Sequence, residues 1–200
     1  MRKLIIATNN KGKFREMKQA LNGLPLEIVL LPAPLETKEG EESYWDNASR
    51  KAIEAVSRWG EISLADDSGL EIESLNGLPG LKSKRIGESD EERIRLILSL
   101  LEGKSWEERK ALFRCVIAIA TPDGILKKAE DIVRGFIAHE PKGKGGFGYD
   151  PIFFLPELGK TMAELSLEEK NKVSHRGRAL MKAREILEKI CLGQYGKSSK

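Results

Sequence analysis

The sequence predicts an α/β fold, a single domain of mixed strands and helices that is either undivided or built of two lobes around a cleft. Short apolar runs of strand length alternate along the 200 residues with segments whose apolar residues recur at helical spacing. No internal repeat and no linker rich in Pro, Gly or Ser divides the chain. We therefore expect one domain over residues 1–192, with residues 193–200 as a flexible C-terminal tail.

Turn residues and apolar spacing place the elements of the first half. Apolar runs that stop at Asn9-Asn10 and at Pro32 predict strands over residues 4–8 and 26–31. Apolar residues three and four positions apart predict helices over residues 12–21 and 46–59. Two further strands, residues 62–65 and 70–74, are expected to flank a turn at Asp66-Asp67-Ser68-Gly69.

The second half continues the alternation. Helical spacing predicts a helix over residues 90–101, which Gly103 ends. Residues 112–121 are the most strand-like segment, and Pro122-Asp123-Gly124 turns them towards another strand near residues 132–138. An apolar run at 152–155 and a long helix over 174–190 complete the expected elements.

Charge is balanced overall but unevenly distributed. With 34 basic and 31 acidic residues the net charge is +3, which gives no reason to expect a nucleic-acid or membrane partner. Residues 36–74, however, carry 11 acidic and 4 basic residues, whereas residues 1–35 and 160–200 are basic. This is either ordinary surface patchiness or a carboxylate cluster for a divalent metal, facing basic groups that bind the same polyanion.

The two cysteines and the N-terminus indicate a cytoplasmic protein. Cys115 and Cys191 have neither zinc-ligand spacing nor the pattern of a disulfide framework. The apolar stretch at residues 4–7 is too short for a signal peptide, and no run is long enough to span a membrane. We therefore expect reduced thiols.

Two common nucleotide-binding motifs are excluded. Gly143, Gly145 and Gly148 match the dinucleotide-binding glycine pattern, but Pro151 and a strand-like run follow where a helix is required. No P-loop sequence occurs. The segment is instead either a plain glycine-rich hairpin or a loop that presents Phe147, Tyr149 and Asp150 to a ligand.

Three polar segments are candidates for chemistry. One segment lies between a strand and a helix, Thr8-Asn9-Asn10-Lys11-Gly12-Lys13. A phosphate-binding site and a solvated helix cap explain it equally well. Asp66-Asp67 favours Mg²⁺ or Mn²⁺ or is a plain acidic turn, and an acidic loop could add a further ligand. Ser174-His175-Arg176 begins the last helix and suits a polar ligand edge. The acidic loop contains Glu36, Glu39, Glu41 and Glu42.

Taken in order, these segments closely resemble the inosine/xanthosine triphosphate pyrophosphatase family, which clears non-standard purine nucleotides from the cell. The resemblance extends from residue 4 to about residue 190. Its motifs are Ala7-Thr8-Asn9-Asn10-Lys11-Gly12-Lys13, Asn47-Ala48 with Lys51-Ala52, Ala65-Asp66-Asp67-Ser68-Gly69-Leu70, Gly77-Leu78-Pro79-Gly80, Gly145-Gly146-Phe147-Gly148-Tyr149-Asp150-Pro151, Lys160-Thr161-Met162-Ala163-Glu164-Leu165, and Lys170 with Ser174-His175-Arg176-Gly177.

The resemblance implies a role for each matching position. Asp67 matches the catalytic general base and magnesium ligand, with Asp66 and Glu39 as expected further ligands. His175 and Arg176 match residues that read the keto edge of the base. The other expected substrate contacts are Thr8, Asn9, Asn10, Lys11, Gly12 and Lys13 for phosphate, Ser68, Phe147, Gly148, Tyr149 and Asp150 around the nucleoside, and Lys170.

The fold implied is an elongated α/β structure of two lobes with a mixed sheet and a central substrate cleft, in a homodimer. The activity implied is Mg²⁺-dependent hydrolysis of ITP, dITP or XTP to the monophosphate and pyrophosphate, with Mn²⁺ as a possible substitute. A septum-inhibition-type pyrophosphatase and a non-enzymatic nucleotide-binding protein remain alternatives. The chain departs from the family pattern at Ser43-Tyr44, where Thr-Phe is usual, and at Lys84 and Ile86.

Overall fold

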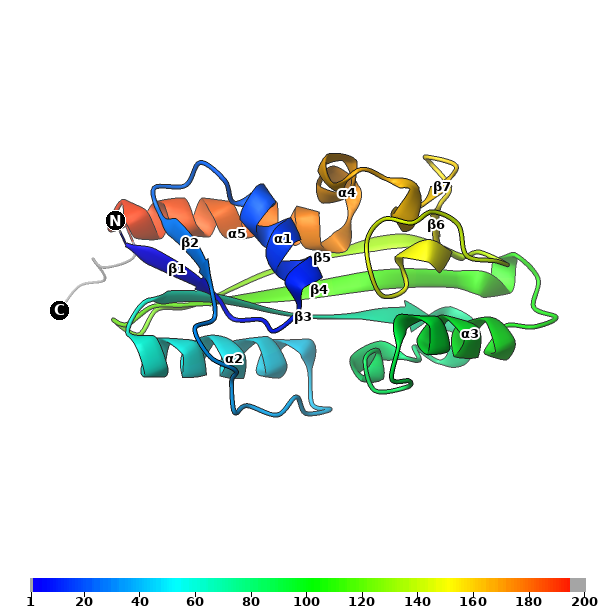
Figure 1. The fold of residues 1–200 in the computed structure, drawn as a ribbon, viewed down its shortest axis with the longest axis horizontal. Coiled ribbons are helices and arrows are strands. Elements are labelled where there is room, and N and C mark those ends of the chain that lie inside the picture. Colours follow the sequence, from blue (N-terminus) through cyan, green and yellow to red (C-terminus); the bar gives the residue numbers. More distant parts are fainter. Residues whose placement is uncertain (1, 195–200) are drawn as a thin grey trace. The chain divides into compact units, whose positions relative to one another are not determined.

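A computed structural model describes residues 2–194 of the chain, so most of the tail expected at 193–200 lies outside the described residues. Short 3-10 turns occur at Glu73–Leu75, Gly80–Lys82, Glu107–Arg109, Asp150–Ile152 and Met162–Glu164. The helices and strands (Figure 1) are β1 (Lys3–Ile6), α1 (Lys11–Ala20), β2 (Glu27–Leu30), α2 (Tyr44–Trp59), β3 (Ile62–Ile72), α3 (Asp90–Leu100), β4 (Lys110–Ala120), β5 (Leu126–Ile137), β6 (Phe153–Leu155), β7 (Lys160–Thr161), α4 (Leu167–Val173) and α5 (His175–Cys191).

The seven strands of the described chain form a mixed sheet, which confirms the predicted α/β class. Their order is β2-β1-β3-β4-β5-β6-β7. β1 pairs in parallel with both β2 and β3, in a register that places Leu4 opposite Ile28 and Ile62. β6 pairs antiparallel with β5 and with β7. The parallel pairs need crossovers, which α1 and α2 supply.

Two compact units make up the described chain. The first contains residues 2–67, 115–131 and 176–194, and the second contains residues 68–114 and 132–175. Neither unit is a continuous stretch of sequence, and β3, β4 and β5 each contribute residues to both. The expectation of a two-lobed domain with a central cleft stays a prediction.

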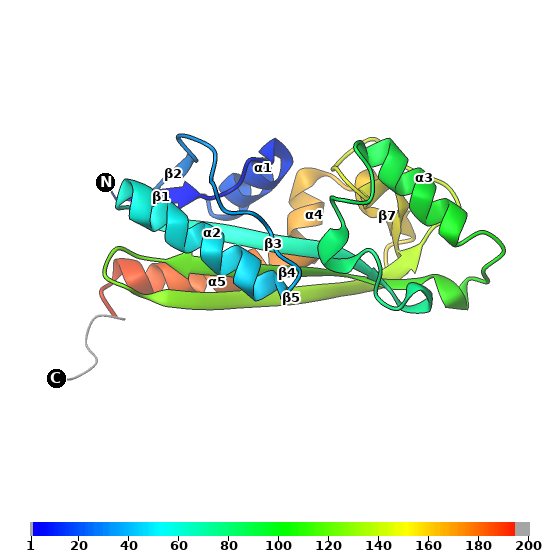
Figure 2. The same cartoon turned by 90° about the horizontal axis from the view of Figure 1, so that it is seen from below.

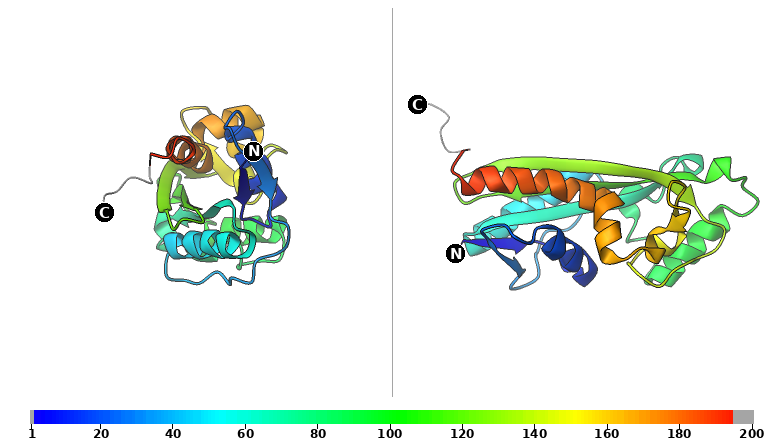
Figure 3. Two further views of the ribbon diagram at one scale, coloured as in Figure 1. Left: turned by 90° about the vertical axis from the view of Figure 1, so that its left-hand side faces the viewer. Right: turned by 90° about the horizontal axis from the view of Figure 1, so that it is seen from above.

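The first unit buries an apolar layer on each face of its strands. Because successive strand residues point to opposite faces, Ile6 and Leu64 pack towards α1 and α5, whereas Ile5 and Ala65 pack towards α2. Figures 1 and 3 show α2 and α5 on opposite sides of these strands. The contacting face of α2 is made of small residues, which let its backbone approach the sheet closely: Ala48, Ala52 and Ala55.

The second unit has a core of its own, in which Ile97 packs with Phe113 and Phe153. Ile97 belongs to α3, the helix labelled in Figure 2. Arg109 is buried there, and its guanidinium donates to the carbonyl oxygens of Leu101, Ile137 and Ala138 at 2.7–2.9 Å. This arginine therefore satisfies backbone acceptors at the ends of α3 and β5, which would otherwise be buried without donors.

One predicted turn is wrong. Residues 62–65 and 70–74 were expected as separate strands, but β3 runs without interruption from Ile62 to Ile72. Asp66 and Asp67 therefore lie inside a strand, where their side chains find polar partners on both faces. The sequence prediction also omitted the short helix α4, and it began β5 six residues too late.

The structure locates both cysteines and describes the apolar character of the helices. Cys115 is buried and Cys191 is half-buried, and neither forms a disulfide. Within residues 2–194, no helix combines the length and the apolar character needed to cross a membrane.

Candidate active site

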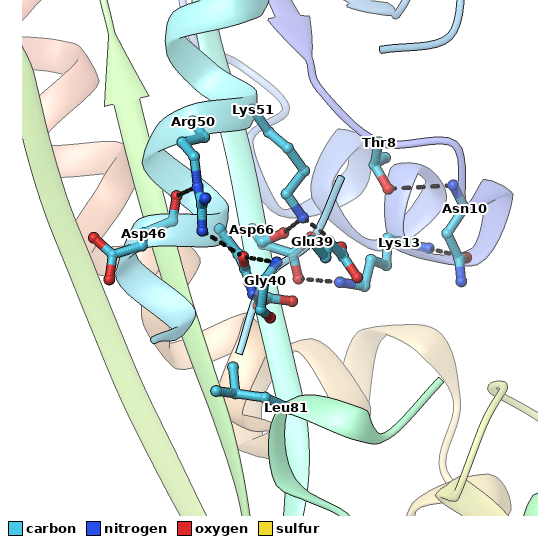
Figure 4. A network of polar contacts seen from close by, with 12 residues as sticks. Thr8, Asn10, Lys13, Glu39, Gly40, Asp46, Arg50, Lys51, Asp66 and Leu81 are labelled. Atoms are coloured by element: carbon cyan, nitrogen blue, oxygen red, sulfur yellow. Dashed lines mark hydrogen bonds and ion pairs between the residues drawn. The ribbon is translucent and has the colours of Figure 1, made fainter. Parts of the chain in front are cut away.

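The segment joining β1 to α1 carries the predicted phosphate-binding residues. Asn10 caps α1 by accepting the N–H of Lys13 at 3.0 Å, and its own N–H donates to Thr8 Oγ1 at 3.2 Å (Figure 4). No acidic residue occupies the first turn of α1, and Lys11 is exposed there. The positive end of the helix therefore keeps its attraction for an anion.

Asp66 lies at the centre of a buried ion network on the α1 and α5 face of β3. Its Oδ2 accepts from Lys13 Nζ at 2.7 Å and from Arg176 Nε at 3.3 Å, and Arg176 NH1 donates to Glu16 Oε2 at 2.6 Å. All four side chains are at most 3% exposed. Burial alone would raise the pKa of Asp66, but Lys13, Arg176 and Lys51 hold it far below its usual value, so the carboxylate stays ionised.

Asp67 occupies a different environment on the α2 face. Its Oδ2 accepts from Asn47 Nδ2 at 2.8 Å. Lys51, one turn further along α2, donates to Glu39 Oε1 at 2.9 Å and to the Asp66 carbonyl oxygen at 2.6 Å (Figure 4). Burial raises the pKa of Asp67 more than Lys51, Lys13 and the Asn47 hydrogen bond lower it. A carboxylate with a raised pKa is a stronger proton acceptor, which suits a general base.

The alternation of β3 separates the carboxylates that the sequence grouped together. Asp66 points towards Lys13 and Cys115, whereas Asp67 points towards Asn47. Within the described residues, Asp66, Asp67 and Glu39 do not form a cluster of three metal ligands. Since Asp66 is already neutralised by two buried cations, its role as a ligand stays a prediction that this geometry does not favour.

The structure distinguishes three of the four glutamates of the acidic loop. Glu39 is the one that contacts Lys51, beside Asp66. Glu42 pairs with exposed Arg50, and Glu36 lies 3.8 Å from Arg58. The start of the loop is fixed by Glu54, which accepts the N–H groups of residues 36 and 37, both at 2.8 Å.

Glu54→Gln is expected to lower the free energy of unfolding near neutral pH, with the deficit shrinking in acid. Although burial opposes it, hydrogen bonds from Thr37, Glu36 and Arg58 lower the pKa of Glu54 to about 2. A lowered pKa gives stability that is complete above the unfolded value near 4.5 and disappears as the pH falls through 2. Urea unfolding of both proteins at pH 7 and pH 3 measures this; an equal deficit at both pH values would contradict it.

The second unit contains the predicted nucleoside-binding segment. Asp150 Oδ2 accepts the Phe147 N–H at 2.7 Å and pairs with Lys170 Nζ, which lies 4.7 Å from the centre of the Phe147 ring. Gly146 has φ +70°, and a Cβ there would stand 2.0 Å from Asp150 Oδ2. The glycines thus allow this loop to pack closely around one buried carboxylate.

The aromatic and imidazole rings of this unit differ in exposure. Phe147 is half-buried, whereas Tyr149 is buried and donates its hydroxyl to the Ser83 carbonyl at 2.6 Å. Phe147 is therefore the better of the two for stacking on a base. His175 is buried and stacks on Phe113, with ring centres 4.5 Å apart. Ser68, the first residue of the second unit, is half-buried.

Sequence reasoning gave no role to three residues that the structure places against the predicted site. Asn47 and Lys51 contact Asp67 and Glu39, and Glu16 contacts Arg176. Asn47 and Lys51 are four positions apart on α2, a spacing that brings side chains to one helix face and that the sequence displays. Glu16 had no comparable signal, because its partner is 160 residues away.

A family model described as the Ham1 family matches residues 4–186. A protein of Desulforamulus reducens named dITP/XTP pyrophosphatase is 46% identical over 198 residues, covering 96% of this chain and 98% of that protein. A protein of Gloeobacter violaceus with the same name is 47% identical over 182 residues, covering 91% and 92%.

Solved structures of similar proteins also match this chain. A HAM1 protein from Coxiella burnetii superposes with a TM-score of 0.82 at 38% identity, covering 94% of this chain and 98% of that one. A structure from Mycobacterium abscessus described as a nucleoside-triphosphatase / dITP/XTP pyrophosphatase gives 0.71 at 40% identity, covering 90% and 98%.

Proposed function

Because the chain belongs to the Ham1 family, we propose that it hydrolyses non-standard purine nucleoside triphosphates, ITP, dITP and XTP, to the monophosphate and pyrophosphate. The observation that carries this proposal is Asp67, a buried carboxylate with a raised pKa that Asn47 orients beside Lys51. Relatives that share nearly the full length of the chain bear the name dITP/XTP pyrophosphatase. The reaction would clear these nucleotides from the cytoplasmic pool.

The donor atoms around Asp67 fit a hard divalent cation. They are carboxylate oxygens of Asp67 and Glu39, which Mg²⁺ and Mn²⁺ prefer. Mg²⁺ commonly binds through one or two protein carboxylates and completes its shell with water and substrate phosphates, so a third ligand from Asp66 is not needed. When bound, the metal would supply positive charge to the triphosphate. We assign Asp66 instead to holding Lys13 and Arg176.

The reaction is a displacement at the α-phosphorus. Asp67 accepts a proton from water as the water oxygen bonds to phosphorus, and the bond from the α-phosphorus to the bridging oxygen breaks to release pyrophosphate. Residues 8–13 bind phosphate oxygens through the N-terminus of α1 and the charge of Lys11 and Lys13. Lys170 adds a cation for the leaving group. Positioning and charge therefore carry most of the catalysis.

Base selection follows from hydrogen-bond donors. Phe147 offers a ring for stacking, and His175 and Arg176 can donate to a carbonyl at purine C6. Arg176 is held by Glu16 and Asp66, so the direction of its guanidinium is fixed before substrate arrives. Adenine presents an amino group at C6, and a donor facing a donor costs on the order of 1–3 kcal/mol per buried group.

ITP, XTP and dITP are expected to be hydrolysed at least about tenfold better, in kcat/KM, than ATP, because one unmatched buried donor is worth that factor. An assay of pyrophosphate release with these nucleotides and GTP, with and without Mg²⁺, measures it. Equal turnover of ATP and ITP, or orthophosphate as the first product, would contradict the proposal. Preference for modified pyrimidines would favour the septum-inhibition type, and binding without cleavage would favour a nucleotide-binding protein.

We also propose that the protein is a homodimer, and light scattering measures its mass in solution.

A further inference from the structure

The side-chain amide of Asn47 has each of its hydrogen-bonding positions occupied. Its Oδ1 accepts the Gly40 N–H at 2.8 Å and Arg50 NH2 at 3.2 Å. Its Nδ2 donates to the Gly40 carbonyl oxygen at 3.2 Å and to Asp67 Oδ2 at 2.8 Å. An amide offers two donor hydrogens and two acceptor positions, so the group is saturated. Asn47 is 1% exposed, so water cannot easily replace these partners.

These four hydrogen bonds require asparagine at position 47. Aspartate has the same shape but lacks both donor hydrogens, and it would set a second carboxylate against Asp67. Serine is too short to reach both partners, and glutamine is one methylene longer. A Cβ at Gly40 would meet only Glu42 Oε2 at 2.0 Å and Arg50 NH2 at 2.9 Å, the ends of exposed side chains that can move aside, so the requirement lies with Asn47.

The contacts of Asn47 join two segments that supply the metal-binding carboxylates. Gly40 directly follows Glu39 in the acidic loop, and Asp67 lies in β3. One turn along α2, Lys51 contacts Glu39 and the Asp66 carbonyl, which again joins the loop to the strand. Two side chains of α2, Asn47 and Lys51, therefore contact both segments, and Asn47 is the uncharged residue of the two.

We propose that Asn47 is a positioning residue that ties the loop bearing Glu39 to the Asp67 carboxylate, so that both carboxylates are held ready for one divalent cation. The inference rests on the proposed function in taking these two carboxylates as the metal ligands. Residues that orient metal ligands commonly change metal affinity or activity by about 10- to 100-fold when they are removed.

The test measures metal binding directly. Mn²⁺ alone is titrated into the wild-type protein and into Asn47→Ala and Asn47→Asp, and free Mn²⁺ is followed by electron paramagnetic resonance. We expect Asn47→Ala to bind Mn²⁺ at least about tenfold more weakly than the wild-type protein, and both variants to lose about tenfold or more in kcat, with KM for ITP changed less. Asn47→Asp keeps the shape of the side chain but lacks both donor hydrogens, so it should not restore kcat.

Ser49→Ala is the matched control. Ser49 lies two positions further along α2, is also buried, and bonds through Oγ to a backbone carbonyl, that of Asp46 at 3.2 Å. It should retain wild-type Mn²⁺ affinity and kcat. If Asn47→Ala binds Mn²⁺ within twofold of wild type, or if Ser49→Ala loses as much, the inference is overturned and Asn47 only stabilises the helix.

A second measurement does not depend on any variant folding. In the wild-type protein the Gly40 N–H should exchange with solvent at least about 100-fold more slowly than an unprotected amide, because Asn47 Oδ1 accepts it. Exchange at the unprotected rate would overturn the tie. A wild-type protein that releases no pyrophosphate from ITP or XTP would contradict the proposed function, whereas the Mn²⁺ comparison and the exchange rate would still decide the role of Asn47.

Discussion

Asp67→Asn is expected to reduce kcat for pyrophosphate release by about 10³-fold or more, because it removes both the general base and a metal-binding carboxylate. An amide keeps the shape of the side chain but cannot accept the proton from water. The measurement is the steady-state rate of pyrophosphate release from ITP at saturating Mg²⁺. Turnover within tenfold of wild type would remove Asp67 from the role assigned to it.

The same substitution should leave the fold intact. Burial raises the pKa of Asp67, which means that the folded protein tolerates the charged form less well than water does. A neutral amide avoids this desolvation, so the melting temperature of Asp67→Asn should stay within a few degrees of wild type. Asp123→Asn is the matched control, since Asp123 is exposed in the turn between β4 and β5. It should alter neither kcat nor the melting temperature.

Glu16→Gln is expected to lower the free energy of unfolding by about 3 kcal/mol, the typical result of removing one partner from a buried ion pair. Glu16 and Arg176 are each 3% exposed, and their atoms are 2.6 Å apart. The substitution keeps the volume of the side chain but leaves the Arg176 charge with less compensation. Urea unfolding at neutral pH gives the value.

Glu188→Gln provides the comparison for that loss. It also pairs with an arginine, Arg184, at 3.0 Å, but the Arg184 and Glu188 side chains are 32% and 48% exposed. Exposed pairs of this spacing contribute about 0.3–0.5 kcal/mol. If the two variants lose equal stability, the buried network contributes no more than a surface pair, and the assignment of Glu16 and Asp66 to holding Arg176 fails.

The fold could be predicted where local signals agree with long-range packing. Helix α2, for example, was predicted over residues 46–59 and spans Tyr44–Trp59, because its apolar spacing agrees with its packing on the sheet. The segment at Asp66 was misread because aspartate, serine and glycine favour turns. What overrides that preference is the set of partners on each face, Lys13 on one side and Asn47 on the other, and these come from distant segments.

The candidate site shows the same division. The positions of Asp67 and Lys170 followed from motifs, but their environments did not, because burial and pairing depend on the whole fold. That Asp66 would be paired with Lys13 and Arg176 while Asp67 faced α2 required knowing that β3 is continuous. Helix α4 could have been found, since Ser166 and Glu169 form a capping box that the sequence contains.

The discontinuity of the first unit sets a limit on when it can form during synthesis. Its apolar core joins Leu4 and Met17 to Leu187 and Ile190, which follow much later in the sequence. On the ribosome, the emerging residues of β1 and α1 must wait for α5 before their buried surface is covered, and such non-local contacts fold slowly. Glu16 likewise lacks its ion-pair partner until Arg176 has been synthesised. A nascent chain released before α5 would therefore expose this half-built core, which makes premature termination a route to aggregation.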